Sequence, residues 1–276
     1  MYFLGIDGGG TKTDCAVGTR TRILGRGTAG SCKIREVDPE TALGNLRACV
    51  TDALRSAAVR GDQIAAASAG IAGASQPDVV DWIQRSLARF VSGRIEVVGD
   101  YVAAFTAAFP DDSPGILVIS GTGSIAFGRN GLGKTARAGG HGPQNSDEGS
   151  GRWIGKLALD SGLLVDAAEV AADPATLVPA VLKLAADGSA EATDLLTGAG
   201  HELAKLVEQV ANELALESPR VRISGSVLQK AIIIQSGLRN ALDHHCPGAN
   251  LDTTPVNILE GALILARRIR AESVAH

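Results

Sequence analysis

Near its start the chain reads Leu4-Gly5-Ile6-Asp7-Gly8-Gly9-Gly10-Thr11-Lys12-Thr13-Asp14, and this stretch predicts the fold. The apolar run from Tyr2 to Ile6 predicts a buried strand, and Asp14 to Val17 predicts the strand that returns beside it. Glycine has no Cβ and tolerates positive φ, so several backbone N–H groups of the turn can converge on an anion. A plain hairpin needs only two turn residues. The longer glycine run therefore favours a phosphate-binding turn.

The carboxylate of Asp7 lies at the end of the first predicted strand. A carboxylate beside phosphate-binding amides requires a cation between them, and Mg²⁺ on a nucleotide is the usual one. We therefore expect Asp7 to hold Mg²⁺ through water. The alternative is an ordinary turn carboxylate.

The composition limits the class of protein. The chain has 276 residues, 45% hydrophobic but only 3% aromatic, which suits small side chains packed between helices and sheets and allows two domains. The net charge is −4 with both signs dispersed, so nothing favours nucleic-acid binding. Four separated cysteines indicate neither a CxxC metal site nor a disulfide framework. The N-terminus shows no signal peptide or membrane span, so we expect a cytoplasmic protein that binds no membrane.

The second half of the chain repeats the opening pattern. The stretch Pro110-Asp111-Asp112-Ser113-Pro114 predicts a domain boundary, because prolines and acids interrupt every periodic pattern. After it come a buried strand (Ile116 to Ser120), the turn Gly121-Thr122-Gly123-Ser124 and a returning strand. We expect an N-terminal domain over 1–111, with part of a C-terminal helix over 256–276 packing back on it, and a C-terminal nucleotide-binding domain over 112–255. Such a duplication predicts one ligand held between two halves.

The remaining elements alternate between strands and helices, which predicts the α/β class. Helices are expected from Pro39, with Asp38 as N-cap, from Tyr101, and as one continuous helix from Val227 to Leu242. Strands are expected at Ile64 to Ile71 and Ile95 to Val98.

The segment Gly128-Arg129-Asn130-Gly131-Leu132-Gly133-Lys134-Thr135 matches the P-loop string. A P-loop requires a helix immediately after it, because the helix N-terminus completes the phosphate site. The residues after Thr135 cannot start a helix, and Asn130-Gly131 favours a hairpin turn. We expect a β-turn with Lys134 on its solvated flank.

Five motifs together resemble a known family. They are Asp7-Gly8-Gly9-Gly10-Thr11, Gly99-Asp100, Ile119-Ser120-Gly121-Thr122-Gly123-Ser124, Asp147-Glu148-Gly149-Ser150 and Ser224-Gly225-Ser226-Val227. Their order resembles that of N-acetylglucosamine and glucosamine kinases of the BadF/BadG-type ATPase family, in the sugar kinase, Hsp70 and actin superfamily. The resemblance implies two ribonuclease-H-like, actin-type ATPase domains with a nucleotide cleft between them.

The resemblance also implies a site for Mg-ATP and a small-molecule sugar. It assigns ATP to two phosphate turns and to a third turn beside the nucleoside: Gly8, Gly9, Gly10, Thr11, Lys12, Gly121, Thr122, Gly123, Gly225 and Ser226. Asp100 is our choice for the general base that accepts the proton of the sugar 6-hydroxyl, since it ends a strand where α/β sheets bind ligands. The alternative role of Asp100 is a helix N-cap.

The predicted sugar contacts are Asp100, Gly73, Asp147 and Glu148, with Gln144 and Asn145 as candidate amide contacts. The alternative role of either acid is only to favour the N-terminus of the helix that follows. Amino-sugar kinases of this type usually place an asparagine in the loop that here reads Gly30-Ser31-Cys32-Lys33. No asparagine is present, so the identity of the sugar stays open.

We therefore expect a cytoplasmic, homodimeric kinase that phosphorylates N-acetylglucosamine or glucosamine at the 6-hydroxyl. The first alternative is an activator ATPase of the 2-hydroxyacyl-CoA dehydratase or benzoyl-CoA reductase type, which holds an iron–sulfur cluster through cysteines at a dimer interface. The second is a protein that senses a sugar without phosphorylating it.

Overall fold

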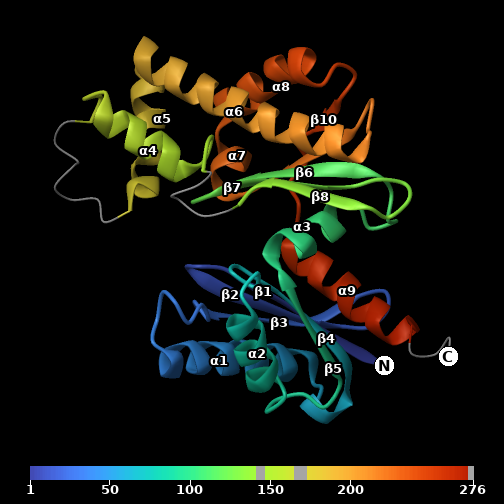
Figure 1. Cartoon of the computed structure of the whole chain (residues 1–276). Helices are drawn as coiled ribbons and strands as arrows, with labels where there is room; N and C mark the ends of the chain where they lie inside the picture. The colour runs from blue at the N-terminus through green and yellow to red at the C-terminus, as the bar shows by residue number, and fades with distance from the viewer. Residues whose placement is uncertain (141–146, 165–172, 273–276) are drawn as a thin grey trace. The chain divides into compact units, whose positions relative to one another are not determined.

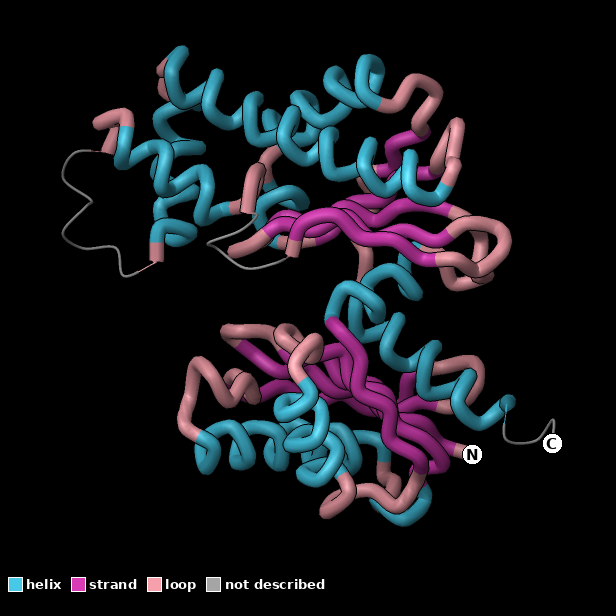
Figure 2. Tube along the Cα trace, in the orientation of Figure 1, coloured by secondary structure: helices cyan, strands magenta, loops and turns pink. Residues whose placement is uncertain are grey.

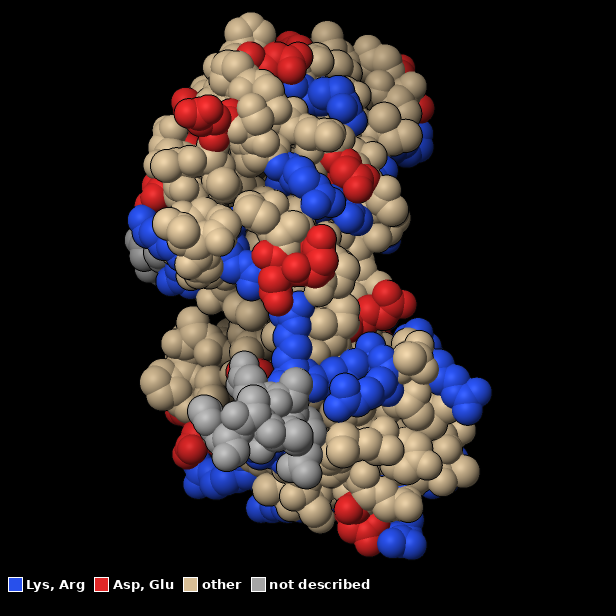
Figure 3. All heavy atoms as spheres, turned by 90° about the vertical axis from the view of Figure 1, so that its right-hand side faces the viewer, with Lys and Arg blue, Asp and Glu red and all other residues tan. Residues whose placement is uncertain are grey.

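The computed structural model describes residues 1–140, 147–164 and 173–272, and the chain divides into two compact units (Figure 1). Unit 1 comprises Met1–Asp112 with Asn257–His276, and unit 2 comprises Ser113–Val256. Each unit contains one sheet and its own covering helices (Figure 2). On the face drawn in Figure 3, acidic and basic side chains are interspersed on each unit.

The sheet of unit 1 has the strand order β3-β2-β1-β4-β5. The strands are β1 (Tyr2–Gly8), β2 (Lys12–Gly18), β3 (Ile23–Gly30), β4 (Ile64–Ile71) and β5 (Arg94–Gly99). The first three form an antiparallel meander, whereas β4 pairs in parallel with both β1 and β5. Three parallel strands therefore end at the same edge of this sheet.

Helices cover both faces of this sheet (Figure 1). Alternate residues of β1 point to opposite faces. Leu4 and Ile6 pack in one core with α1 (Pro39–Ala57) and α2 (Pro77–Leu87), and Phe3 packs in another with α9 (Ile258–Glu272). Helix α3 (Asp100–Ala108) packs beside α9. Asp38 caps α1 by accepting from Glu40 and Thr41 N–H groups, which confirms the predicted helix start.

The sheet of unit 2 has the strand order β10-β9-β6-β7-β8. The strands are β6 (Gly115–Ser120), β7 (Ser124–Arg129), β8 (Thr135–Gly139), β9 (Arg220–Ser224) and β10 (Asn250–Asp252). Strands β6, β7 and β8 are antiparallel, and β9 pairs in parallel with β6 and β10. The helices are α4 (Gly151–Asp160), η3 (Pro174–Leu177), α5 (Val178–Ala186), α6 (Ala190–Leu214), α7 (Ser226–Lys230) and α8 (Ile232–His245). The core of unit 2 lies between its sheet and α6 and α8.

The P-loop string forms the hairpin between β7 and β8, which confirms the predicted turn. The Asn130 side chain accepts hydrogen bonds from the Leu132 and Lys134 N–H groups at 3.0 Å each, and the Lys134 side chain is 56% exposed. No helix follows Thr135, so the segment lacks the phosphate site of a P-loop.

The prediction of one helix from Val227 to Leu242 is wrong, because the helix breaks at Ala231. Ala231 leaves the helical region, with φ −96° and ψ 88°. The side-chain amide of Gln235 donates to the Leu228 carbonyl at 2.7 Å, which satisfies a backbone acceptor at the break. Apolar periodicity continues through the break, so the pattern alone did not show it. The three-residue strand β10 was also too short to predict.

Candidate active site

The carboxyl edge of the unit 1 sheet brings two predicted acidic residues together. In the ladders Asp7 lies opposite Gly70, and Ile71 lies opposite Gly99, which precedes Asp100. The carboxyl ends of parallel strands are where open α/β sheets bind ligands. The two carboxylates are close enough to interact electrostatically. This edge is therefore the candidate site of unit 1.

Asp7 is mostly buried at the end of β1. Burial, together with the nearby carboxylates of Asp100 and Asp14, raises the pKa of Asp7 to about 6. Among the described residues no group of three or more acids, histidines and cysteines is arranged to hold a metal ion. A cation at Asp7 would thus rely on water and phosphate oxygens for its other ligands, as Mg²⁺ commonly does.

The glycine turn between β1 and β2 closes through one backbone hydrogen bond, from Gly9 N–H to the Lys12 carbonyl at 3.0 Å. Gly10 and Thr11 are exposed. The Lys12 ammonium forms an ion pair with Asp14 at 2.6 Å and is 66% exposed. The structure thus forms the predicted glycine turn, and its binding of phosphate stays a prediction.

Asp100 is the first residue of α3, with Gly99 in the N-cap position. Its Oδ1 accepts a hydrogen bond from the Tyr101 N–H at 2.9 Å. Burial raises the pKa of the Asp100 carboxyl, and the Lys33 ammonium opposes part of that rise. A carboxylate whose pKa is shifted toward neutrality is suited to accept a proton.

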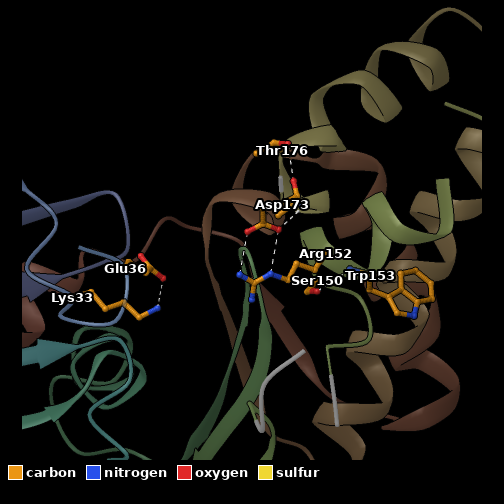
Figure 4. A network of polar contacts seen from close by, with 8 residues as sticks. Lys33, Glu36, Ser150, Arg152, Trp153, Asp173 and Thr176 are labelled. Carbon is orange, nitrogen blue, oxygen red and sulfur yellow. Dashed lines mark hydrogen bonds and ion pairs between the residues drawn. The ribbon is translucent and has the colours of Figure 1, made fainter. Parts of the chain in front are cut away.

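A loop over 31–36, which follows β3, lies against the glycine turn. The Ser31 hydroxyl donates to the Gly9 carbonyl at 3.0 Å, and the Asn45 side chain donates to the Ser31 carbonyl at 2.8 Å. Lys33 and Glu36 form an ion pair of 2.5 Å (Figure 4). Gly73 has φ +89°, and a Cβ built there would lie 3.9 Å from the Lys33 Cε.

In unit 2, the turn over 121–123 is joined to the loop before α4 by hydrogen bonds. The Ser120 and Ser124 hydroxyls donate to the Gly149 and Glu148 carbonyls at 2.8 Å each. The Gly151 N–H donates to the Gly121 carbonyl, also at 2.8 Å. The start of α4 therefore lies directly against this turn.

The Asp147 side chain lies beside this turn, with its Oδ1 2.9 Å from a Cβ built at Gly123. Its Oδ2 is buried without a hydrogen-bond partner among the described residues, and burial raises the pKa of the carboxyl. Glu148 is exposed. Gln144 and Asn145 lie outside the described residues.

Sequence reasoning missed a bidentate ion pair at the start of α4. Arg152 donates to both carboxylate oxygens of Asp173, through Nε at 3.2 Å and Nη2 at 3.1 Å (Figure 4). The two residues are 21 positions apart, so no local pattern indicated the pair. It fixes η3 against α4, and Asp173 also caps η3.

The third predicted turn joins β9 to α7. Gly225 has φ +92°, and a Cβ there would lie 2.2 Å from the Ser120 carbonyl oxygen, so only glycine fits beside β6. One turn of helix further on, at the α7–α8 break, is a largely apolar cavity of about 280 Å³. It is lined by Leu182, Ala185 and Ala186 of α5 and by residues 230–233.

None of the helices in the described residues is long and apolar enough to cross a membrane.

Two characterised sugar kinases are similar to this chain in sequence. The N-acetylmuramic acid/N-acetylglucosamine kinase of Clostridium acetobutylicum is 35% identical over 166 residues, 59% of this chain. The match covers about half of that kinase, 53% of its length. The N-acetyl-D-glucosamine kinase of Dictyostelium discoideum is 25% identical over 312 residues, covering 96% of this chain and 97% of that protein.

Solved structures support the two-domain, ribonuclease-H-like fold. A ROK family glucokinase from Streptomyces griseus, solved with glucose and AMPPNP, matches with a TM-score of 0.69. The two sequences are 17% identical, and the match covers 97% of this chain and 100% of the glucokinase chain. The family model of the BadF/BadG/BcrA/BcrD ATPases matches residues 4–263. The chain therefore belongs to the BadF/BadG/BcrA/BcrD ATPase family, as its five motifs predict.

Proposed function

We propose that this protein is an ATP-dependent sugar kinase that transfers the γ-phosphoryl group to the 6-hydroxyl of an amino sugar, N-acetylglucosamine or glucosamine. The two sequence relatives described above are kinases of N-acetylated sugars, which supports this substrate class. The observation that carries the proposal is the position of Asp100, which lies at the same edge of the unit 1 sheet as Asp7 and the glycine turn.

Asp100 is the proposed general base. Its carboxylate is half-buried at the start of α3, and burial raises its pKa. A base of this kind accepts the proton of the sugar hydroxyl as the oxygen attacks phosphorus. The Asp100 Oδ1 accepts a hydrogen bond from the Tyr101 N–H, and a carboxylate has further acceptor sites for the sugar.

The ATP phosphates are assigned to the glycine turn Gly8–Thr11 with Lys12 and to the turn over 121–123. Each turn has an exposed threonine, which adds a hydroxyl donor to those of the backbone. Phosphoryl transfer is catalysed mainly by positioning and by neutralising charge, so such donors supply much of what the reaction requires.

Mg²⁺ fits the Asp7 carboxylate. Asp7 lies among other acids, and its pKa of about 6 shows that its negative charge is poorly stabilised there. A divalent cation relieves that repulsion and, when bound, neutralises charge on the transferring phosphoryl group.

The nucleoside is assigned to Gly225, Ser226 and the apolar cavity at the α7–α8 break. The cavity wall is built from aliphatic side chains, which suits the flat face of a purine base. Asp147, Glu148 and Gly73 remain proposed sugar contacts. The Asp147 Oδ2 supports the first of these, since it has no hydrogen-bond partner in the described part of the chain and a sugar hydroxyl would satisfy it.

The test is a panel of sugars with Mg-ATP, monitored for sugar 6-phosphate and ADP. We expect turnover with at least one amino sugar and slow ATP hydrolysis without sugar, because a productive site excludes water. Failure with every amino sugar and hexose would contradict the kinase assignment. We also propose that the protein is a cytoplasmic homodimer. Light scattering of the purified protein tests the dimer, and cell fractionation tests the location.

An activator ATPase is the second candidate. The activator of 2-hydroxyisocaproyl-CoA dehydratase from Clostridium difficile matches with a TM-score of 0.55 at 11% identity, which concerns the fold alone. A cluster shared between two subunits requires accessible cysteines. All four cysteines here are buried: Cys15, Cys32, Cys49 and Cys246. A colourless purified protein with sugar-dependent turnover is therefore the expected result. A sensor that does not phosphorylate its sugar would not require a base such as Asp100.

A further inference from the structure

The ion pair of Lys33 and Glu36 lies where the proposed phosphate and sugar contacts meet within unit 1. The Glu36 Oε2 is 2.6 Å from a Cβ built at Gly10, so this carboxylate lies beside the glycine turn. On the other side, the aliphatic chain of Lys33 approaches Gly73, and its ammonium is close enough to Asp100 to affect it electrostatically.

The loop that carries the pair is fixed to the turn. The Ser31 hydroxyl both donates to the Gly9 carbonyl at 3.0 Å and accepts from the Lys33 N–H at 3.1 Å. Asn45 of α1 holds the Ser31 carbonyl at 2.8 Å. The Lys33 side chain is only 27% exposed, which distinguishes it from ordinary surface lysines of this chain such as Lys156 at 71%. Lys33 is therefore held beside the site.

The chemistry of the pair limits what can bind against it. An ammonium offers three N–H donors and no acceptor, and a carboxylate offers acceptors only. A sugar hydroxyl or an acyl oxygen can accept from Lys33, and a hydroxyl can donate to Glu36. A protonated amine cannot accept from Lys33 and is repelled by its charge. The attraction of that amine to Glu36 is offset, because Lys33 already neutralises Glu36 at 2.5 Å.

We propose that Lys33, supported by Glu36, is a specificity-determining residue that selects sugars presenting an uncharged oxygen acceptor, such as an N-acetyl group, over sugars with a protonated amine. The inference rests on the proposed kinase function and narrows its substrate from two amino sugars to the acylated one.

The experiment compares kcat/KM for N-acetylglucosamine and glucosamine in the wild type, in Lys33→Met and in Lys33→Asn. We expect the wild type to prefer N-acetylglucosamine, and its kcat/KM for glucosamine to rise relative to N-acetylglucosamine between about pH 6.5 and about pH 8.5, as the sugar amine loses its proton. Each variant should reduce the preference about tenfold or more, chiefly through KM, and should flatten this relative pH dependence.

The variant Lys33→Met removes the ammonium donor but leaves the Glu36 carboxylate without its partner. The double variant Lys33→Met with Glu36→Gln removes that charge as well, so it separates the loss of the donor from the effect of the Glu36 charge. If Lys33 acts as proposed, the double variant also loses the preference for the acylated sugar. The matched control is Lys205→Met, since Lys205 and Glu202 form a similar i, i+3 ion pair of 2.7 Å on α6. This control should keep the wild-type preference.

An unchanged substrate ratio in both Lys33 variants, with activity retained, would overturn the role of Lys33 and leave the kinase assignment intact. A wild type that prefers glucosamine at the lower pH would also overturn it. The absence of turnover with any sugar would overturn the proposed function and this inference with it.

Discussion

A single substitution can separate the helix contact of Asp100 from its proposed role as general base. Its Oδ1 accepts from the Tyr101 N–H at the start of α3, and an asparagine can accept the same hydrogen bond. Asparagine cannot accept the proton of a sugar hydroxyl. We expect Asp100→Asn to fold normally and to lose about 10²-fold or more in kcat. Steady-state kinetics with circular dichroism measure both effects, and unchanged turnover would exclude the role as base.

Asp7 predicts an unusual dependence of stability on pH. Its pKa is about 6 in the folded protein, against 3.8 for an unperturbed aspartate, so folding disfavours the charged form. The penalty is absent below about pH 4, where both states are protonated, grows through the interval up to about pH 6, and is complete above it. Two pKa units correspond to about 3 kcal/mol.

The variant Asp7→Asn removes that penalty. We expect it to raise the free energy of unfolding of the ligand-free protein at about pH 8 by up to about 3 kcal/mol, and to change it little near pH 4. Urea unfolding at the two pH values measures the difference. The same variant should lose the stabilisation that Mg-ATP gives the wild type. A variant that is less stable than the wild type at high pH would show that Asp7 is not destabilised by its surroundings.

Among the elements, the junction of β9 and α7 depends on a residue without a side chain. An alanine Cβ at Gly225 would meet the Ser120 carbonyl oxygen at 2.2 Å, in addition to the strain of φ +92°. Gly133, in the β7–β8 hairpin, also has positive φ (+81°) but has nothing within 4 Å of a Cβ. The two glycines therefore differ mainly in the clash.

We expect Gly133→Ala to cost about 1–2 kcal/mol, the strain of left-handed backbone alone. Gly225→Ala should cost more and should also raise the KM for ATP, because the end of β6, which leads into the turn over 121–123, must move. Urea unfolding and ATP kinetics of both variants test this. Equal losses of stability with unchanged ATP kinetics would indicate that Gly225 serves only the backbone conformation.

At the scale of the whole molecule, each unit has a hydrophobic core of its own. Leu203 is fully buried in the core of unit 2, whereas Leu132 is 94% exposed. We expect Leu203→Ala to destabilise unit 2 by about 2–5 kcal/mol. Hydrogen exchange followed by mass spectrometry should show faster exchange in α6 and α8 and little change in β1 and β4. Leu132→Ala is the control and should leave exchange in both units unchanged.

Much of the fold could be predicted from the sequence because its signals are local. The glycine turns, the strands that precede them and the cap at Asp38 each depend on residues close together in the chain. The same signals located Asp7 and Asp100, since Asp7 lies at the end of an apolar strand and Asp100 directly follows one. The break at Ala231 could not be predicted, because the apolar periodicity of α7 and α8 is continuous and the break is supported by the Gln235 side chain.

The sequence by itself determined the α/β class, the family and the residues at the ends of the strands, because strand periodicity and glycine turns are properties of short segments. Only the tertiary structure decided which side chains meet. Parallel pairing of β1, β4 and β5 places Asp7 and Asp100 at one edge of the sheet, where burial raises the pKa of each carboxyl and the Asp100 charge raises that of Asp7 further. Packing of the 31–36 loop against Gly9 places Lys33 beside Asp100. Such electrostatic neighbours depend on strand register and loop packing, which no local pattern in the chain encodes.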